Sequence, residues 1–175
     1  MLHAHAMPDD VVEALLDSHA EARAMVALAE RLPRALADES SADVARQVSS
    51  FLRWYQDVHF ADEERSLMRL LLGRNRIIDQ TISELTLEHL QLSALLSRVG
   101  FLCELIGRDA ARLLAVRFEL ADVVSEARRR LFAHQEREES MLFPAIRRLL
   151  DWDDVEEMRS EMAMRRAPGV ELREV

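Results

Sequence analysis

The 175-residue chain contains no lysine and only one cysteine, Cys103. A single cysteine excludes an internal disulfide and is typical of proteins from a reducing compartment. The first fifteen residues contain neither a basic segment nor a long apolar run, so the sequence predicts no secretory signal peptide. The longest apolar runs span only a few residues, which predicts that no helix crosses a membrane. We therefore expect a cytoplasmic protein.

Glycine and proline are also scarce, with four of each, and the β-branched and aromatic clusters typical of strands are absent. The chain is rich in alanine, leucine, arginine and glutamate, which favours long helices. A net charge of −9 argues against nucleic-acid binding, because that function requires a basic surface. The length suits one domain with a substantial core. We therefore expect one all-α domain.

Apolar residues at helical spacing predict four long helices and a short fifth one. The long helices are bounded by capping or helix-breaking residues and run from about Pro8 to Pro33, from Ser40 to Gly73, from Ile77 to Gly107, and from Asp109 to beyond Pro144, which is expected to kink the last turns. The first helix is expected to bury Val12, Leu15 and Leu16. The third has the most regular seam, at Ile78, Ile82, Leu85, His89, Leu92, Leu96, Val99, Cys103 and Ile106.

Long helices with short connections predict an up-down-up-down four-helix bundle over residues 9–150. Residues 1–8 are expected to form a flexible N-terminus, and residues 151–175 a C-terminal helix and tail. That helix places Trp152, Val155, Met158 and Met162 on one face. The face either packs on the bundle or forms a dimer contact, so we expect a monomer or a homodimer.

Polar residues occupy core positions on the stripes of all four long helices. One histidine lies on each stripe: His19, His59, His89 and His134. Because residues four apart are neighbours on a helix, Glu63 shares a face with His59. Glu138 shares a face with His134 in the same way, and both pairs begin the pattern His-x-x-x-Glu-Glu. An unpaired buried carboxylate costs several kcal/mol, so we predict that metal ions neutralise the two glutamates.

The two halves of the chain match, because His19 and the motif at His59 are echoed by His89 and the motif at His134. Two glutamates that can bridge, with histidines on either side, are typical of a dinuclear site in a bundle core. Imidazole and carboxylate suit iron, and also zinc or manganese. His89 lies about 18 residues before Gly107 and His134 about 25 residues after Asp109, so the two are predicted to be out of level unless the fourth helix has a longer lead-in or tilts.

At these residues the chain resembles the hemerythrin-like HHE cation-binding domain, over about residues 9–150. The resemblance is carried by His19, His59-x-x-x-Glu63, His89 and His134-x-x-x-Glu138, with Glu139 and Phe143-Pro144 also typical of the family. It implies a four-helix bundle that holds two non-haem iron ions joined by an oxo or hydroxo bridge. It further implies that Glu63 and Glu138 bridge the irons and that the four histidines are terminal ligands.

The chain departs from the oxygen-carrying hemerythrins at Ser93, one turn after His89, where those proteins carry another histidine. With one imidazole fewer, an iron keeps an open position unless water or another side chain fills it. Tyr55, one turn before His59, is either a packed aromatic or a residue that supports the ligands.

The resemblance and the ligand set together predict binding or sensing of a small diatomic ligand, O2 or NO, at an open iron position. The pocket would lie in an apolar seam formed by Phe51, Leu85, Leu92 and Met141. The alternatives are a di-iron enzyme of oxidative or nitrosative stress that decomposes peroxide, and a protein of iron-centre repair. Repair proteins of this family usually carry a cysteine-bearing N-terminal segment, which this sequence lacks. No catalytic residue is predicted, and whether the protein is an enzyme stays open.

Overall fold

The computed structural model describes residues 8–167 of the protein. The flexible start expected for residues 1–8 therefore falls outside the described residues except for Pro8, which begins the first helix. The end of the predicted tail, residues 168–175, also lies outside them.

The described residues are helical throughout, apart from short connections, and contain no strand. The elements, in chain order, are α1 (Pro8–Ala29), η1 (Leu32–Arg34), α2 (Glu39–Trp54), η2 (Tyr55–His59), α3 (Phe60–Asp62), η3 (Glu63–Met68), α4 (Arg69–Leu71), α5 (Arg76–Arg108), α6 (Arg112–Arg137), η4 (Glu138–Leu142), α7 (Phe143–Leu149) and α8 (Trp152–Arg166).

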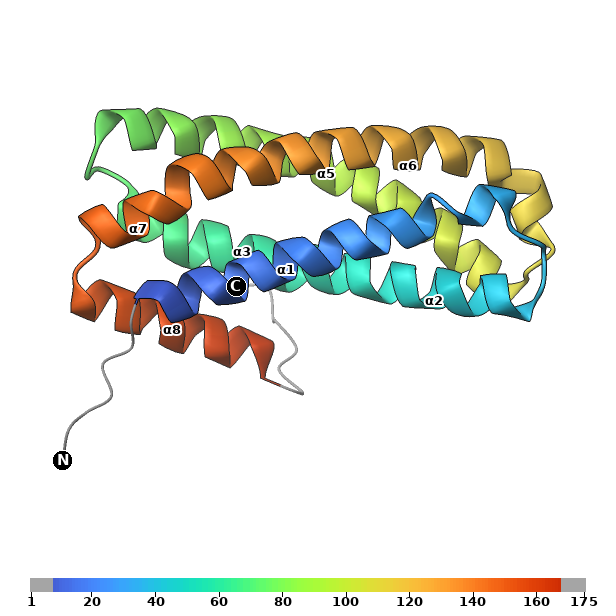
Figure 1. Ribbon diagram of the computed structural model, residues 1–175, viewed down its shortest axis with the longest axis horizontal. Coiled ribbons are helices and arrows are strands. Elements are labelled where there is room, and N and C mark those ends of the chain that lie inside the picture. The colour runs from blue at the N-terminus through green and yellow to red at the C-terminus, as the bar shows by residue number, and fades with distance from the viewer. Residues whose placement is uncertain (1–7, 168–175) are drawn as a thin grey trace.

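Residues 8–167 form five helices besides the short 3-10 turn η1, because some of these elements continue one another. We call residues 39–71 (α2 to α4) the second long helix and residues 112–149 (α6 to α7) the fourth long helix; the π-helical turns η2, η3 and η4 lie inside them. α2 contacts α1 and α5, and α6 contacts α5 and α1. The four long helices therefore surround a common core, and α8 lies beside α1 at one end of the molecule (Figure 1).

Local signals set the helix ends. Asp38 accepts a hydrogen bond from the backbone N–H of Ser41 (3.1 Å) at the start of α2. Gly73, with a φ of 81°, follows the end of the second long helix, as predicted from its sequence. Asp151 and Asp154 form a capping box that begins α8. The fourth long helix begins at Arg112, three residues later than the Asp109 start that the sequence suggested.

The apolar seam predicted for the third long helix is confirmed, because all of its members are buried along α5. Two apolar residues that the sequence placed on helix stripes are exposed; Leu16 was predicted to face the interior, and Trp152 was predicted either to pack on the bundle or to form a dimer contact. Leu16 is 38% exposed, since its neighbour Leu15 already points inward and the two lie about 100° apart around the helix. Trp152 is 51% exposed, because the buried face of α8 is centred on Val155, Met158 and Met162.

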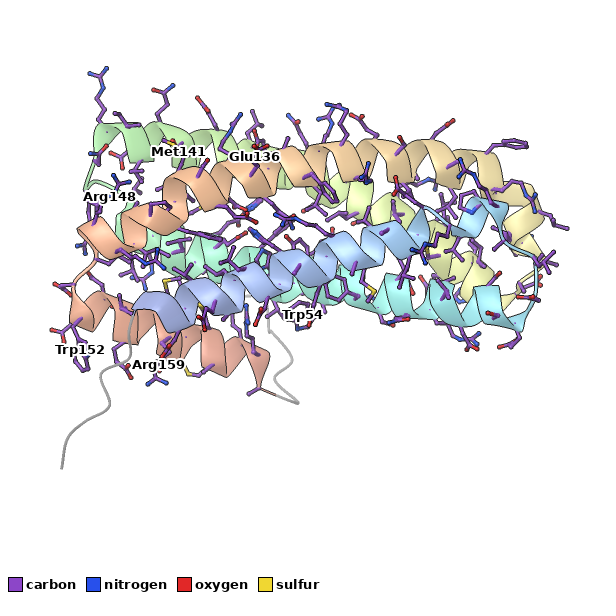
Figure 2. All side chains as sticks on the ribbon, in the orientation of Figure 1. Trp54, Glu136, Met141, Arg148, Trp152 and Arg159 are labelled. Carbon is purple, nitrogen blue, oxygen red and sulfur yellow. The ribbon has the colours of Figure 1, made fainter. Side chains whose placement is uncertain are left out.

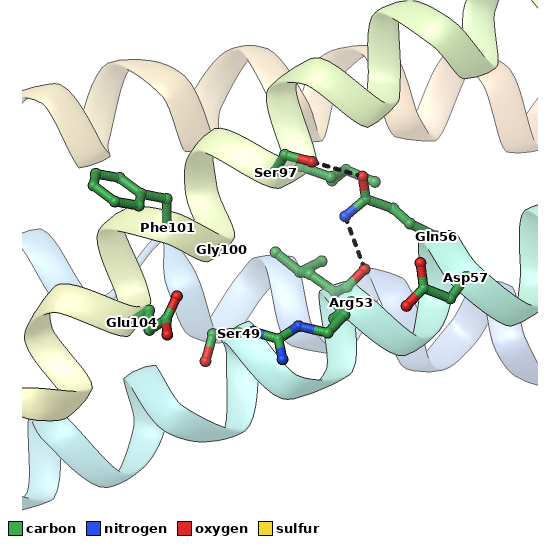
Figure 3. A pocket seen from close by; sticks show the side chains of 10 residues that line it. Ser49, Arg53, Gln56, Asp57, Ser97, Gly100, Phe101 and Glu104 are labelled. Carbon is green, nitrogen blue, oxygen red and sulfur yellow. Dashed lines mark hydrogen bonds between the residues drawn. The ribbon is translucent and has the colours of Figure 1, made fainter. Parts of the chain in front are cut away.

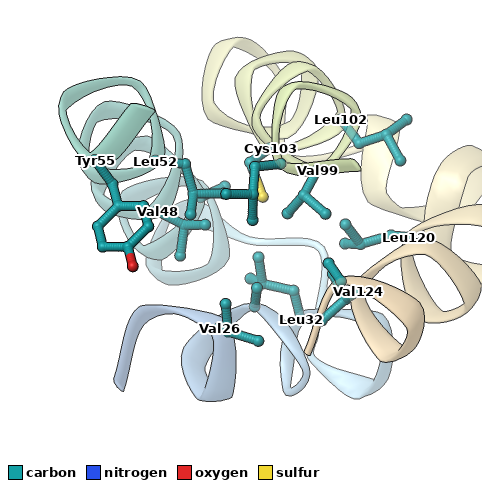
Figure 4. Close-up of a cluster of buried hydrophobic side chains, with 14 of the residues drawn as sticks. Val26, Leu32, Val48, Leu52, Tyr55, Val99, Leu102, Cys103, Leu120 and Val124 are labelled. Atoms are coloured by element: carbon teal, nitrogen blue, oxygen red, sulfur yellow. The ribbon is translucent and has the colours of Figure 1, made fainter. Parts of the chain in front are cut away.

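Two apolar clusters fill the core. One contains residues of the bundle half that includes the α5–α6 connection, among them Val26, Leu52, Leu96 and Leu120 (Figure 4). The other contains Leu15, Leu67, Leu85 and Leu142 and includes the buried residues of α8. Each predicted ligand histidine lies in sequence between a member of the first cluster and a member of the second. A polar layer therefore separates the two apolar clusters.

Within the described residues, α5 is the one helix long and apolar enough, by length and composition alone, to cross a membrane. The sequence-based prediction missed it because single polar residues such as His89 interrupt its apolar runs. A core helix passes the same test, and α5 contacts both α2 and α6. This property is therefore a weak indication of a membrane span.

Candidate metal centre

The residues predicted as metal ligands converge in the polar layer, and each is at most 2% exposed: His19, His59, Glu63, His89, His134 and Glu138. α1 and α5 supply one histidine each, and the second and fourth long helices each supply one His-x-x-x-Glu pair. The expected convergence of all four helices on one centre is what the structure shows. The ligand role of these residues stays a prediction.

The possible ligand atoms form two clusters that share Glu63. The first consists of His19, His59 and Glu63. The second consists of Glu63, His89, His134 and Glu138. Within each cluster the ligand atoms lie within 4.8 Å of one another. His19 is therefore grouped with His59, and His89 with His134, a pairing that sequence alone left open.

The two glutamates are placed between the histidine pairs. Glu63 directs Oε1 at Nε2 of His59 (3.1 Å), and its Oε2 lies 3.3 Å from Nε2 of His89. Glu138 directs Oε1 at Nε2 of His134 (3.2 Å), and its Oε2 lies 3.4 Å from Nε2 of His19. Each carboxylate thus presents one oxygen to each histidine pair, which is the arrangement that two shared carboxylates need.

Several of these atoms are buried without a hydrogen-bond partner among the described residues. They are Nε2 of His59, His89 and His134, Oε2 of Glu63, and both carboxylate oxygens of Glu138. A buried polar atom left without a partner costs about 1–3 kcal/mol. Imidazole nitrogens and carboxylate oxygens that converge in this way suit transition-metal ions. The donor set therefore fits two metal ions.

The charges in this layer shift the ionisation of its members. Burial lowers the pKa of His19, but the negative carboxylates of Glu138 and Glu63 beside its ring outweigh burial and raise it to about 10. The same competition raises the pKa of His89 to about 11. Burial and the charge of Glu63 raise the pKa of Glu138, yet the surrounding histidines hold it at about 2. The carboxylates are therefore ionised, and in the metal-free protein protonated histidines lie beside them.

Three of the histidines are oriented by carboxylates outside the predicted ligand set. Nδ1 of His19 donates to Glu139 (2.9 Å), and Nδ1 of His89 donates to Glu64 (2.7 Å). An ionised carboxylate only accepts, so each Nδ1 carries the proton and Nε2 faces the centre. The second glutamate of each His-x-x-x-Glu-Glu motif therefore orients a histidine from another helix. Its presence in both copies was the sequence signal for this role.

The two motif histidines differ in their surroundings. Nδ1 of His134 donates to Glu88 (2.9 Å), a contact that nothing in the sequence pattern indicated. Nδ1 of His59 has no hydrogen-bond partner among residues 8–167. Its ring instead stacks on Tyr55, with ring centroids 4.3 Å apart. The Tyr55 hydroxyl accepts a hydrogen bond from Gln135 (3.0 Å), so Tyr55 is a packed aromatic that supports a predicted ligand.

The π-helical turns coincide with the ligand motifs. η2 ends at His59, η3 begins at Glu63, and η4 begins at Glu138. Such turns insert extra backbone and recur at functional sites. η4 ends at Leu142, two residues before Pro144, where the sequence predicted a kink; a proline lacks the N–H that would bond one turn back. The sequence carried no signal for the π-helical turns in the second long helix.

The predicted difference in level between His89 and His134 is absent, since their ring centroids lie 4.6 Å apart. The later start of α6, at Arg112, shortens the lead-in to His134 by three residues. At about 1.5 Å per residue this removes about 4.5 Å of the mismatch.

Grooves on the surface of the described bundle include two that lie between neighbouring long helices. The first, of about 310 Å³, lies between α5 and α6 and is lined by His134 and Leu92, with Arg129, Arg130 and Arg137 among its charged lining residues. The second, of about 240 Å³, lies between the second long helix and α5 (Figure 3). The second groove is lined by none of the predicted ligands, whereas the first reaches one of them. The α5–α6 groove is therefore the better route to the centre.

Comparison with known proteins gives one finding. The family model of the hemerythrin HHE cation binding domain matches residues 10–104, which is more than half of the chain. The matched span contains His19, His59, Glu63 and His89 and ends before the second His-x-x-x-Glu pair. It is shorter than the resemblance to residues 9–150 noted from the sequence. No curated protein and no solved structure gave a match.

Proposed function

The chain belongs to the hemerythrin HHE cation-binding family, and we propose that it is a non-haem di-iron protein that binds or senses a small diatomic ligand, O2 or NO. In this proposal the four long helices form the up-down-up-down bundle expected from the sequence. The observation that carries the proposal is the set of buried, partnerless imidazole and carboxylate atoms between two histidine pairs. Zinc or manganese would suit the same donor atoms, so the choice of iron comes from the family.

In this proposal each ligand has a separate role, which the distances between the side chains support. His19 and His59 would hold one ion, and His89 and His134 the other. Glu63 and Glu138 would be shared, because each presents an oxygen to both histidine pairs. A reduced iron pair supplies electrons and a coordination position for a diatomic gas.

The surrounding residues prepare the centre for such a ligand. Glu139, Glu64 and Glu88 hold the protons of three histidines on the outer nitrogen, which keeps Nε2 directed inward. The two apolar clusters exclude water on either side of the polar layer. This environment favours a small uncharged ligand over bulk solvent.

We place the open position on the side of His89 and His134. Ser93 follows His89 by one turn of α5 and is half-buried, at the position where the oxygen-carrying hemerythrins carry another histidine. The α5–α6 groove reaches His134 and Leu92 on the same side. A small molecule arriving through this groove would meet the His89–His134 pair first.

Metal analysis and rapid mixing test the proposal. The protein purified from its native host should contain two irons per chain, and the anaerobically reduced protein should change its visible spectrum when mixed with O2 or with NO. The His59→Ala variant serves as the control with a damaged centre. Zinc as the sole metal would contradict the di-iron assignment, and an unchanged spectrum with both gases would contradict the binding role.

The same material distinguishes the alternative of a stress enzyme. Loss of H2O2 with iron-loaded protein at a rate well above that of His59→Ala would favour peroxide decomposition. A rate equal to the control, together with a spectral response to O2 or NO, would favour binding or sensing.

A further inference from the structure

Two consecutive arginines at the end of α8 bind a carboxylate that lies next to the centre. Arg165 Nε donates to Oδ1 of Asp62 (2.6 Å), and Arg166 Nε donates to Oδ2 (2.8 Å). Asp62 is fully buried and directly precedes Glu63. An unpaired carboxylate there would be costly, so the Asp62 site needs these cations from α8.

Arg166 also reaches α1. It donates to the hydroxyl of Ser18 (3.1 Å) and to the backbone carbonyl of Ala14 (3.4 Å). Ser18 directly precedes His19. One guanidinium therefore joins the chain neighbours of Glu63 and His19, two members of the His19–His59–Glu63 cluster.

The other half of the centre contains a corresponding contact within the bundle. Arg137, which directly precedes Glu138, donates to Glu88 (2.7 Å), which directly precedes His89. Its guanidinium also lies 3.3 Å from Glu84, one turn earlier on α5. This arginine therefore joins the fourth long helix to α5 beside the His89–His134 pair.

The duplication aligns these two contacts. When His19 is matched with His89 and Glu63 with Glu138, Ser18 corresponds to Glu88 and Ala14 to Glu84. Asp62 then corresponds to Arg137, so the first half carries an acid where the second half carries the bridging cation. Arg166 makes its contacts at Ser18 and Ala14, the positions that match the partners of Arg137.

We propose that α8 completes the metal centre, with Arg166 as a positioning residue for the His19–His59–Glu63 half. Arg166, which lies outside the duplicated helices, joins the helices that carry His19 and Glu63. Arg137, which lies within them, joins the helices that carry His89 and Glu138. Arg165 assists by holding the second oxygen of Asp62 and the hydroxyl of Ser66 in η3. This inference rests on the proposed dinuclear centre.

The packing of α8 suits this role. Val155, Met158 and Met162 are buried against the second apolar cluster, which anchors the helix on α1 and η3. Arg166 is only 25% exposed and lies over the ring of Trp54, 5.9 Å from its centroid. The guanidinium is thus held in place on several sides, as a positioning group requires.

A matched pair of variants tests the proposal by metal titration. Arg166→Ala removes the guanidinium beside the His19–His59–Glu63 half of the centre, and Arg137→Ala removes the guanidinium beside the His89–His134 half. Arg159→Ala is the control, because Arg159 is exposed, pairs with Glu156 within α8 and points away from the bundle (Figure 2). Metal-free protein is titrated with Co²⁺, and anaerobically with Fe²⁺, and both binding steps are fitted.

Arg166→Ala should weaken one of the two metal positions by about 10–100-fold and leave the other at wild-type affinity, since loss of outer partners of metal ligands has effects of this size. Arg137→Ala should weaken the opposite position. His19→Ala and His134→Ala supply reference spectra, because each removes a ligand from one half. The Co²⁺ spectrum of Arg166→Ala at one equivalent should match that of His19→Ala, and the spectrum of Arg137→Ala that of His134→Ala.

Other results would overturn the inference. If Arg166→Ala binds both ions as the wild type does, or loses affinity equally at both positions, α8 is not tied to one half. A wild-type protein that binds fewer than two ions would refute the dinuclear centre itself, before any variant is compared. If Arg166→Ala loses helical content in far-UV circular dichroism, Asp62→Asn takes its place, because it removes the carboxylate charge but keeps the side-chain shape. Asp62→Asn must then weaken metal binding at the same single position, and wild-type affinity at both positions would overturn the inference.

Discussion

Metal binding should release protons even at pH 8, where histidines with an ordinary pKa are already neutral and have no proton to release. The pKa of His19 is about 10 and that of His89 about 11, so at pH 8 in metal-free protein both rings carry a proton on each nitrogen and are positively charged. A metal ion binds only the neutral imidazole, so each proton must leave. The two carboxylates contribute none, because the pKa of Glu138 is about 2 and that of Glu63 is held well below its usual value by nearby histidines despite burial.

The expected release is at least two protons per chain at pH 8. His19 belongs to one ligand cluster and His89 to the other, so each metal ion displaces at least one proton. The affinity for each ion should therefore rise about tenfold per pH unit between pH 8 and about 10, or about 1.4 kcal/mol per unit. Histidines with an ordinary pKa of about 6.5 would be neutral at pH 8 and would release almost nothing.

Isothermal titration calorimetry measures this release. Co²⁺ is titrated into metal-free protein at pH 8 in buffers with different ionisation enthalpies, and the slope of observed enthalpy against buffer enthalpy gives the number of protons. A slope of two or more agrees with the reasoning. A slope near zero, with both ions bound, would show that the carboxylates do not raise the histidine pKa values and would refute it.

Three further results are expected. The metal-free protein should lose thermal stability as the pH rises from about 6.5 through about 10, because the raised pKa of His19 stabilises the fold only while the imidazole is protonated; a melting temperature that increases over this range would contradict the shift. Glu139→Gln should lower Co²⁺ affinity about 10–100-fold at one position, because it weakens the partner of His19, and wild-type affinity at both positions would exclude this role. Leu96→Ala should reduce the free energy of unfolding in urea by about 2–5 kcal/mol, since Leu96 is fully buried, and a loss below about 1 kcal/mol would argue against its core position.

The features predicted most reliably are those set by neighbours along one helix. Every member of the α5 seam is buried because a repeat of three and four residues confines those side chains to one face. Glu63 lies beside His59 for the same reason. The error falls at the edge of such a face, as with Leu16, where a rotation of about 100° between consecutive residues decides between core and solvent.

Other features depend on extra backbone or on loops. η2 and η3 interrupt the second long helix at the ligand motif, although residues 39–71 contain no proline or glycine that would mark an irregular turn. The three-residue delay before α6 removes about 4.5 Å of the expected difference in level between His89 and His134, and periodicity cannot show where a connection ends.

The sequence by itself determined the helices and the six candidate ligands, because apolar periodicity and four-residue spacing act within a single helix. Only the tertiary structure decided that His19 pairs with His59, that Glu88 orients His134, and that Arg166 reaches Asp62. These contacts join residues on different helices, so they follow from the order, rotation and level at which the helices pack. The periodicity of a single helix does not determine its order, rotation or level relative to the other helices.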